Sequence, residues 1–81
     1  MTDQEALKRI ARNVKHLREE AGLSMGALAR QIETYPITIK RIEDEANMPG
    51  LGLCTRLAEA FEVSIEDLLA EHPAKIFSSV A

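Results

Sequence analysis

The stretch LSMGALARQIETYPITIKRIE, residues 23–43, decides the fold. Ser24 is a preferred helix N-cap, and Leu23 before it and Leu28 after it stand at the positions of a hydrophobic staple. Pro36 suits the first position of a further helix, because an N–H there would have no partner in any case. The stretch therefore predicts two short helices joined by a tight turn.

The second of these helices is expected over residues 36–45, and it has two different faces. Ile39 and Ile42 point toward the core. The opposite edge carries side chains at helical spacing: Ile37, Lys40, Arg41 and Asp44. One edge of this helix is therefore expected to face solvent.

Three further helices are expected around this pair. Thr2 and Glu5 have the form of a capping box, and Gly22 suits the end of the helix that they begin. Ser64 caps a brief last helix that reaches about Glu71, before Pro73 stops it. Apolar residues at helical spacing supply the inner faces: Leu7, Ile10, Val14 and Leu17 in the first helix, and Leu51, Cys54, Leu57, Ala58 and Phe61 in the fourth. The sequence predicts an all-α fold, a compact five-helix bundle.

Length and composition narrow the class of protein. The 81 residues suffice for one domain, and a composition of 46% hydrophobic but only 4% aromatic residues favours packed helices. No apolar run approaches the roughly 18 residues of a membrane span, and the polar start lacks the pattern of a secretion signal. The lone Cys54 excludes an internal disulfide and suits a reducing cytoplasm. We expect a cytoplasmic protein with one domain over residues 1–72 and a tail over residues 73–81.

Charge is distributed unevenly along the chain. The formal net charge is −3, but residues 1–42 hold eight Lys or Arg against five Asp or Glu, and residues 43–81 hold two against eight. A molecule polarised in this way can still present its positive half to nucleic acid. The net charge alone does not exclude that partner.

Catalysis and metal binding are not expected. His16 and His72 are isolated, with no Cys or His at metal-ligand spacing, and Cys54 lies on an apolar helix face as a small core residue. The carboxylates lie on exposed faces without a nucleophile, a phosphate loop or a convergent acid–base set. We expect no metal, no cofactor and no enzyme activity.

Several short motifs follow one another in a characteristic order over residues 7–70. They are Leu17-Arg18, Gly22-Leu23-Ser24, Leu28-Ala29, Ile39, Ile42-Glu43, Pro49, Leu57-Ala58, Val63-Ser64 and Leu68-Leu69. Each motif is weak alone, but their joint spacing resembles the Cro/repressor-type helix-turn-helix family, also called the XRE family. The resemblance implies a homodimer on a near-palindromic DNA operator, with one recognition helix per half-site and half-sites about 34 Å apart.

The resemblance also implies roles for individual residues. Arg18 and Glu43 fall where family members form an internal ion pair, and the alternative is two solvated charges. The DNA-facing positions correspond to Met25, Gly26, Tyr35, Pro36, Ile37, Lys40 and Arg41. Arg41 suits guanine O6 and N7, Ile37 a thymine methyl, and Lys40 and the Tyr35 hydroxyl suit phosphates. Gly26 leaves the free amides of the second helix uncovered for a phosphate.

Other features leave a second reading open. Pro36 and Ile37 stand where the family usually has polar residues, Glu33 stands at a frequent glycine position, and Asp44-Glu45 replaces glycine and basic residues. These departures favour, as an alternative, a helix-turn-helix used for protein contact, such as an antirepressor or an antitoxin-like partner. The basic residues of the first helix can contact phosphate or form a solvated face: Lys8, Arg9, Arg12, Lys15 and Arg18.

The tail is expected to help the chain dimerise. Ile76, Phe77 and Val80 are its apolar residues, and they can pack across a two-fold axis or belong to a frayed terminus. The sequence as a whole predicts a sequence-specific DNA-binding transcriptional regulator of the repressor type, acting as a homodimer.

Overall fold

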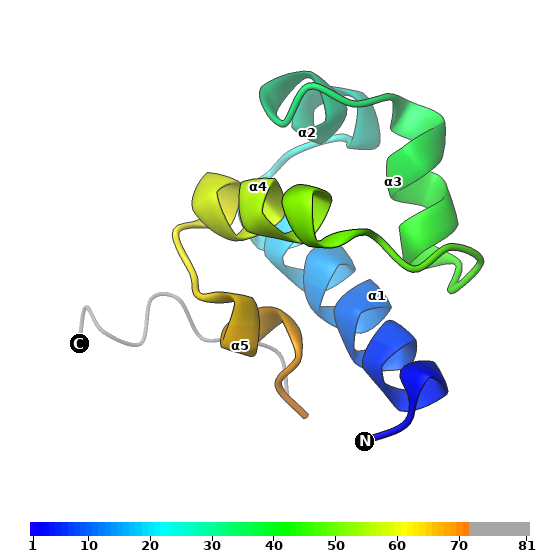
Figure 1. The fold of residues 1–81 in the computed structure, drawn as a ribbon. Helices are drawn as coiled ribbons and strands as arrows, with labels where there is room; N and C mark the ends of the chain where they lie inside the picture. Colours follow the sequence, from blue (N-terminus) through cyan, green and yellow to red (C-terminus); the bar gives the residue numbers. More distant parts are fainter. Residues whose placement is uncertain (72–81) are drawn as a thin grey trace.

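The chain folds into helices alone over the residues that the structure describes. The computed structural model describes residues 1–71, and these form α1 (Asp3–Glu20), α2 (Met25–Gln31), α3 (Pro36–Glu43), α4 (Leu51–Phe61) and α5 (Ile65–Leu68) (Figure 1). The expected all-α, five-helix fold is confirmed. The tail over residues 73–81, with Ile76, Phe77 and Val80, lies outside the described residues, as do His72 and Pro73.

The helices begin where the sequence supplies caps. Thr2 Oγ1 accepts the Glu5 amide at 3.1 Å, and Glu5 Oε1 accepts the Thr2 amide at 3.0 Å. The Thr2 amide and the Thr2 hydroxyl both donate to Glu5 Oε1 and lower the pKa of the Glu5 carboxyl, because they stabilise its charged form. Ser24 accepts an amide of the first turn of α2 at 3.0 Å, Pro36 opens α3, and Ser64 forms a second capping box in α5. Side-chain caps therefore set the start of three of the five described helices, and a proline in the first position sets the start of α3.

Four helices end in the same way. After α1, Gly22 adopts φ 70°, and after α2, α3 and α4 a glutamate takes that place, with φ 58° at Glu33, 60° at Glu45 and 57° at Glu62. In each case the next amide bonds back to a carbonyl five residues earlier, at 2.8 to 3.0 Å. The helix expected over residues 36–45 therefore ends two residues early, because Glu45 is left-handed and cannot continue it.

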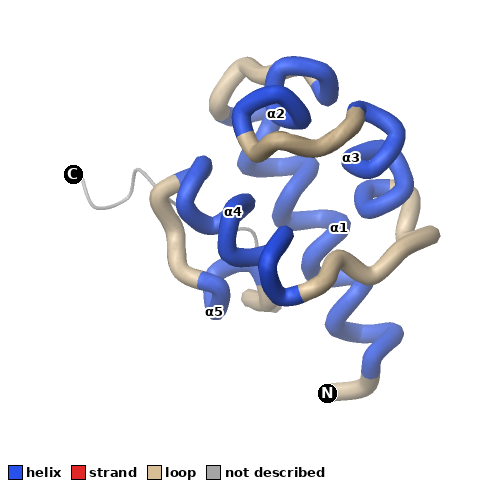
Figure 2. Tube along the Cα trace, turned by 45° about the horizontal axis from the view of Figure 1, so that its top comes forward, coloured by secondary structure: helices blue, strands red, loops and turns tan. Residues whose placement is uncertain are grey.

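The core is built on α1, against which α3, α4 and α5 pack, and α2 packs in turn on α3. Figure 2 shows the course of these helices. The largest fully buried side chains of the core come from every helix: Val14, Leu17, Leu28, Ile39, Ile42, Leu57 and Leu68. Two residues expected on inner faces lie outside the core, and Leu7 of α1 is one of them, since it is half-buried and does not pack against the core cluster. Leu51 is 75% exposed, because it opens α4 on the solvent side of the first turn, whereas Cys54 and Leu57 of the same helix are buried.

The end of α5 is held by side chains of α1. Asn13 is fully buried, and its Nδ2 donates to the carbonyl of Leu68 at 2.8 Å and to that of Ala70 at 3.0 Å. Arg12 donates to the Ala70 carbonyl at 2.8 Å, and Arg9 reaches the neighbouring Leu69 carbonyl at 3.5 Å. These bonds satisfy carbonyls that the end of a helix leaves without partners. The helix α5 ends at Leu68, short of the expected Glu71.

The described part of the chain bears on membrane spanning and on metal binding, and it contains the one cysteine. Among residues 1–71, no helix is both long enough and apolar enough to cross a membrane, and no cluster of His, Cys, Asp and Glu has a metal-binding arrangement. Cys54 is buried and its Sγ donates to the Pro49 carbonyl at 3.7 Å. Burial raises the pKa of this thiol, which disfavours the reactive thiolate.

Candidate nucleic-acid interface

The helix pair α2–α3 lies at one side of the molecule and presents the outer edge of α3 to solvent (Figures 1 and 2). Ile39 and Ile42 are completely buried on the inner face of α3, against α1 and α2. The 3.6-residue period then leaves Ile37, Lys40 and Arg41 on the outside, and all three are exposed. This side of α3 is called the exposed edge below.

A bidentate ion pair fixes α3 to α1. Arg18 Nε donates to Glu43 Oε2 at 2.7 Å, and Arg18 Nη2 donates to Glu43 Oε1 at 3.0 Å. The third guanidinium nitrogen donates to the Leu23 carbonyl at 2.9 Å, ahead of α2. The side chains of Arg18 and Glu43 are only 12% and 3% exposed, and the hydrogen bonds that Arg18 donates to Glu43 raise the pKa of Arg18. One guanidinium therefore joins α1, the start of α2 and the end of α3.

The exposed edge carries two cations in different states. Lys40 Nζ lies 2.6 Å from Asp44 Oδ2, an ion pair one helical turn long in which both side chains are more than half exposed. Arg41 is exposed, and within residues 1–71 it forms no ion pair. The sequence already placed Lys40 and Asp44 four residues apart, which is the spacing that signals such a pair. Arg41 is thus the cation of this edge whose charge is not neutralised locally.

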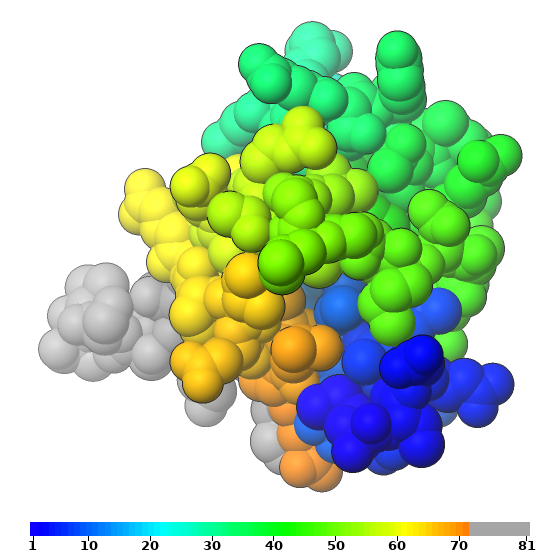
Figure 3. Space-filling view, viewed as in Figure 1, coloured from blue at the N-terminus to red at the C-terminus, as the bar shows by residue number. Residues whose placement is uncertain are grey.

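Apolar side chains gather around the same region. Within residues 1–71, five large hydrophobic side chains are strongly exposed, and all except Met1 lie between residues 35 and 51: Tyr35 (74%), Ile37 (49%), Met48 (41%) and Leu51 (75%). In the space-filling view α3 and the chain leading into α4 lie next to each other on one face (Figure 3). Pro36 is exposed beside them.

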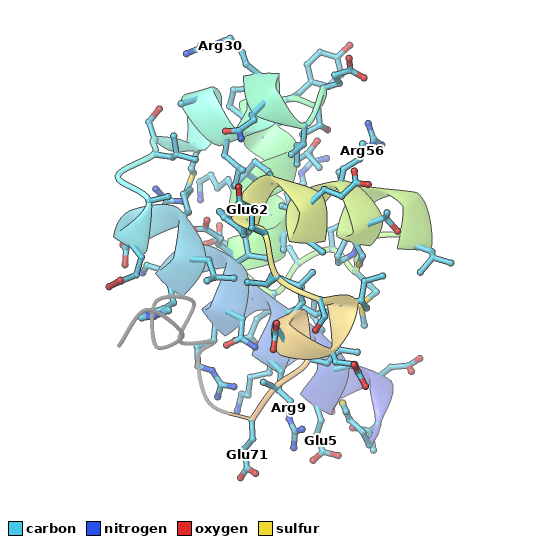
Figure 4. All side chains as sticks on the ribbon, turned by 90° about the vertical axis from the view of Figure 1, so that its left-hand side faces the viewer. Glu5, Arg9, Arg30, Arg56, Glu62 and Glu71 are labelled. Atoms are coloured by element: carbon cyan, nitrogen blue, oxygen red, sulfur yellow. The ribbon has the colours of Figure 1, made fainter. Side chains whose placement is uncertain are left out.

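The start of α2 differs from expectation in detail. Met25 is half-buried and packs against the core, so only part of its side chain faces outward. A Cβ placed on Gly26 would meet only Ser24 Oγ at 3.9 Å and Arg30 Nη1 at 4.0 Å, which are ordinary contacts. The space at Gly26 is therefore not required by packing. The guanidinium of Arg30 lies near the first turn of α2 and its side chain is exposed (Figure 4).

Arg30 is a candidate contact residue that sequence reasoning missed. Its position four residues after Gly26 is the signal that could have found it, because residues i and i+4 share a helix face. Of the cations on α1, by contrast, Arg9, Arg12 and Arg18 bind carbonyls or Glu43 of this chain, and Lys8 and Lys15 are exposed. The structure therefore leaves only part of the basic residues of α1 available to an outside partner.

Comparisons with known proteins agree with this geometry. A family model described as a helix-turn-helix domain matches residues 9–71. A crystal structure of an HTH_3 family transcriptional regulator from Vibrio cholerae is similar with a TM-score of 0.79 and 28% identity, over 96% of this chain and 43% of that one. The chain therefore spans less than half the length of that regulator. No curated protein matches the sequence.

A second solved structure is of similar size. The hypothetical transcription factor NHTF from Neisseria has a TM-score of 0.77 and 22% identity, over 100% of this chain and 92% of that chain. At this identity the likeness bears on the fold alone. The family match extends from α1 to the end of α5 and so includes the α2–α3 pair with its connecting turn. The chain belongs to the helix-turn-helix domain family.

Proposed function

We propose that the chain is a sequence-specific DNA-binding transcriptional regulator that inserts the exposed edge of α3 into the major groove. The observation that carries this proposal is the contrast between the two faces of α3. Ile39 and Ile42 are fully buried and the Arg18–Glu43 pair fixes the helix end, while Arg41 is exposed without a partner in residues 1–71. The major groove of DNA is about 12 Å wide and admits an α-helix, so a rigidly held helix with one exposed edge can enter it.

The neighbouring residues have supporting roles in this proposal. Tyr35 lies ahead of α3 with its side chain 74% exposed, so its hydroxyl can donate to a phosphate beside the groove. The guanidinium of Arg30 lies near the first turn of α2, and this turn, with Met25 and Gly26, supplies further contacts to the DNA backbone. Pro36 lacks an N–H and serves by shape, because its ring sets the entry angle of α3.

We further propose that two copies bind together as a repressor in the cytoplasm. One copy offers a single recognition helix of eight residues, Pro36–Glu43, which reads only a few base pairs. A two-fold pair reads two half-sites about 34 Å apart and so doubles the contact set. Ile76, Phe77 and Val80 remain the proposed dimer contacts, and a repressor acts by occupying a palindrome of this spacing.

Selection of bound duplexes from a random pool tests this function. The full chain should recover a palindrome with half-site centres 10 to 10.5 base pairs apart, or a multiple of that spacing. Arg41→Ala should bind the recovered duplex more weakly by about 1–3 kcal/mol and with relaxed base preference. Recovery of no consensus, together with no shift of random duplex at low salt, would contradict the proposal.

A protein partner is the second candidate function, and one observation favours it. The exposed apolar residues Tyr35, Ile37, Met48 and Leu51 flank the exposed acidic pair Asp44 and Glu45 in the sequence, a composition that suits a protein surface better than a phosphate backbone. Such a chain would act as an antirepressor or as an antitoxin-like partner. It would leave duplex DNA unshifted even in dilute buffer, whereas a regulator binds random duplex weakly and in a salt-sensitive way.

A further inference from the structure

The exposed edge of α3 holds few groups that can distinguish one base pair from another. What these groups recognise is inferred on the basis of the proposed function, insertion of α3 into the major groove. Lys40 is engaged by Asp44 at 2.6 Å. Pro36 has no amide hydrogen and Thr38 is half-buried. The remaining outward groups within α3 are the guanidinium of Arg41 and the branched alkyl chain of Ile37, which is 49% exposed.

Each of these two groups matches one kind of base in the major groove. A guanidinium forms two parallel hydrogen bonds with O6 and N7 of guanine, a pattern that no other base presents. An alkyl side chain gains nothing from polar base edges, but it packs against the C5 methyl of thymine, which is the one apolar group in that groove. Ile37 and Arg41 therefore point to thymine and guanine.

The spacing along α3 sets how far apart the two bases lie. Four residues of α-helix advance by about 6 Å, and successive base pairs rise by about 3.4 Å. Two side chains separated by one helical turn therefore reach base pairs one or two steps apart. Ile37 lies in the first turn, the part of a recognition helix that enters the groove most deeply.

We propose that each half-site contains a thymine and a guanine one or two base pairs apart, on either strand. Ile37 reads the thymine by its C5 methyl, and Arg41 reads the guanine by O6 and N7. Lys40 adds no base discrimination, because its ammonium stays with Asp44 or meets a phosphate. Ile37 is thus a specificity-determining residue, although it carries no polar group.

The test changes single atoms of the DNA. In the selected duplex, deoxyuridine replaces the thymine of each half-site and so removes only the methyl group. The wild-type chain should lose affinity by about fourfold per half-site, the value of one buried methyl. Replacement of the guanine by 7-deazaguanine removes one of two acceptors and should lower the affinity by about tenfold.

Protein variants then assign each effect to one side chain. Ile37→Ala should be insensitive to deoxyuridine and keep its response to 7-deazaguanine, and Arg41→Ala should show the reverse. Leu51→Ala is the matched control, because it removes an exposed leucine from α4 (75% exposed) and should retain both responses. Circular dichroism checks that all three variants fold, which is expected because all three side chains are substantially exposed.

The outcomes separate this inference from the proposed function. If the wild-type chain binds a selected duplex but deoxyuridine has no effect at any thymine, the inference is overturned and DNA binding stands. The same holds if Ile37→Ala keeps its sensitivity to deoxyuridine, since another residue would then read the methyl. If no duplex is bound at low salt, the proposed function fails and this inference fails with it.

Discussion

A side chain in the left-handed region crowds its own carbonyl, and Glu33, Glu45 and Glu62 all occupy this region with φ between 57° and 60°. Glycine avoids the crowding, as Gly22 does at the end of α1 with φ 70°. The three glutamates therefore retain local strain at the ends of α2, α3 and α4. Position 33 lies in the turn between α2 and α3, and position 45 directly follows the proposed DNA-reading helix.

Replacing Glu62 by glycine should stabilise the chain. The free energy of unfolding should rise by about 1 kcal/mol. This gain is the backbone strain that glycine relieves, reduced by the larger conformational entropy that glycine gives the unfolded chain. Urea denaturation measures it. Glu59→Gly is the matched control, because it makes the same chemical change inside α4 and should destabilise by about 1 kcal/mol. Equal effects of the two changes would show that φ at position 62 is not left-handed in solution.

The Arg18–Glu43 pair is the residue contact on which the position of α3 depends most. Its two side chains are 12% and 3% exposed, so loss of one partner leaves the other charge largely out of water. Arg18→Met or Glu43→Leu alone should destabilise by about 3 kcal/mol, and the two changes together should recover much of that loss. Urea midpoints of the four proteins measure the coupling. Losses that simply add would exclude a direct pair.

At the scale of elements, the sequence predicted helix starts better than helix ends. A start is signalled by a side chain that accepts a free amide, as Thr2, Ser24 and Ser64 do, so it can be recognised locally. The ends of α2, α3 and α4 are set by a backbone conformation at glutamate, a residue type that gives no sign of it. The hold of Asn13 on α5 was also missed, because it joins residues more than fifty positions apart.

The sequence predicted part of the candidate site, namely which side chains of α3 face solvent. Periodicity placed Ile37, Lys40 and Arg41 on the outside of α3, because one buried face fixes the other. It also gave Lys40 and Asp44 the four-residue spacing of an ion pair, but it did not reveal that Arg41 forms no ion pair within residues 1–71, or that Leu51 is exposed. Only packing in three dimensions decides which charges stay free.

The buried amide of Asn13 should control how firmly α5 is held. Its Nδ2 serves carbonyls of Leu68 and Ala70, while its Oδ1 is buried without a partner in residues 1–71. Asn13→Ala should destabilise by about 2 kcal/mol, because buried carbonyls lose their donor. Hydrogen exchange at the Leu69 and Ala70 amides should speed up with it. Arg12→Ala, which removes an exposed donor to the same Ala70 carbonyl, should cost less than 1 kcal/mol. An Arg12 effect as large as that of Asn13 would contradict this assignment.

For the whole molecule, the distribution of charge matters more than its sum of −3. Three of the eight acids in residues 43–81 lie on α4 and α5, but Asp44 and Glu45 follow α3 directly, where the helix C-terminus already carries partial negative charge. These two acids oppose phosphate at the proposed interface. The net charge therefore hides the cations Arg30, Lys40 and Arg41 on α2 and α3. It also does not show that Lys40 is paired with Asp44.

Asp44→Asn should strengthen DNA binding and make it more sensitive to salt. Freeing Lys40 adds one phosphate contact, which steepens the slope of log affinity against log salt by about 0.9. Between 50 and 200 mM salt, the affinity of Asp44→Asn for random duplex should therefore fall about three- to fourfold more than the affinity of the wild-type chain does. Fluorescence anisotropy at several salt concentrations measures it. Glu66→Gln removes one charge from α5 and should leave the slope unchanged.

An unchanged slope for Asp44→Asn would mean that Lys40 already contacts phosphate in the wild-type complex. In that case the pair with Asp44 opens on binding, at a loss of only about 0.5 kcal/mol for an exposed pair.

The clamp of Asn13, Arg9 and Arg12 on the last carbonyls of α5 also fixes where the described chain leaves the bundle. Glu71 lies at the opposite end of the body from Arg30, the cation of α2 (Figure 4). A fluorescent reporter or a purification tag joined beyond residue 71 would therefore be tethered across the molecule from the helix pair. Such fusions should leave the helix pair unobstructed.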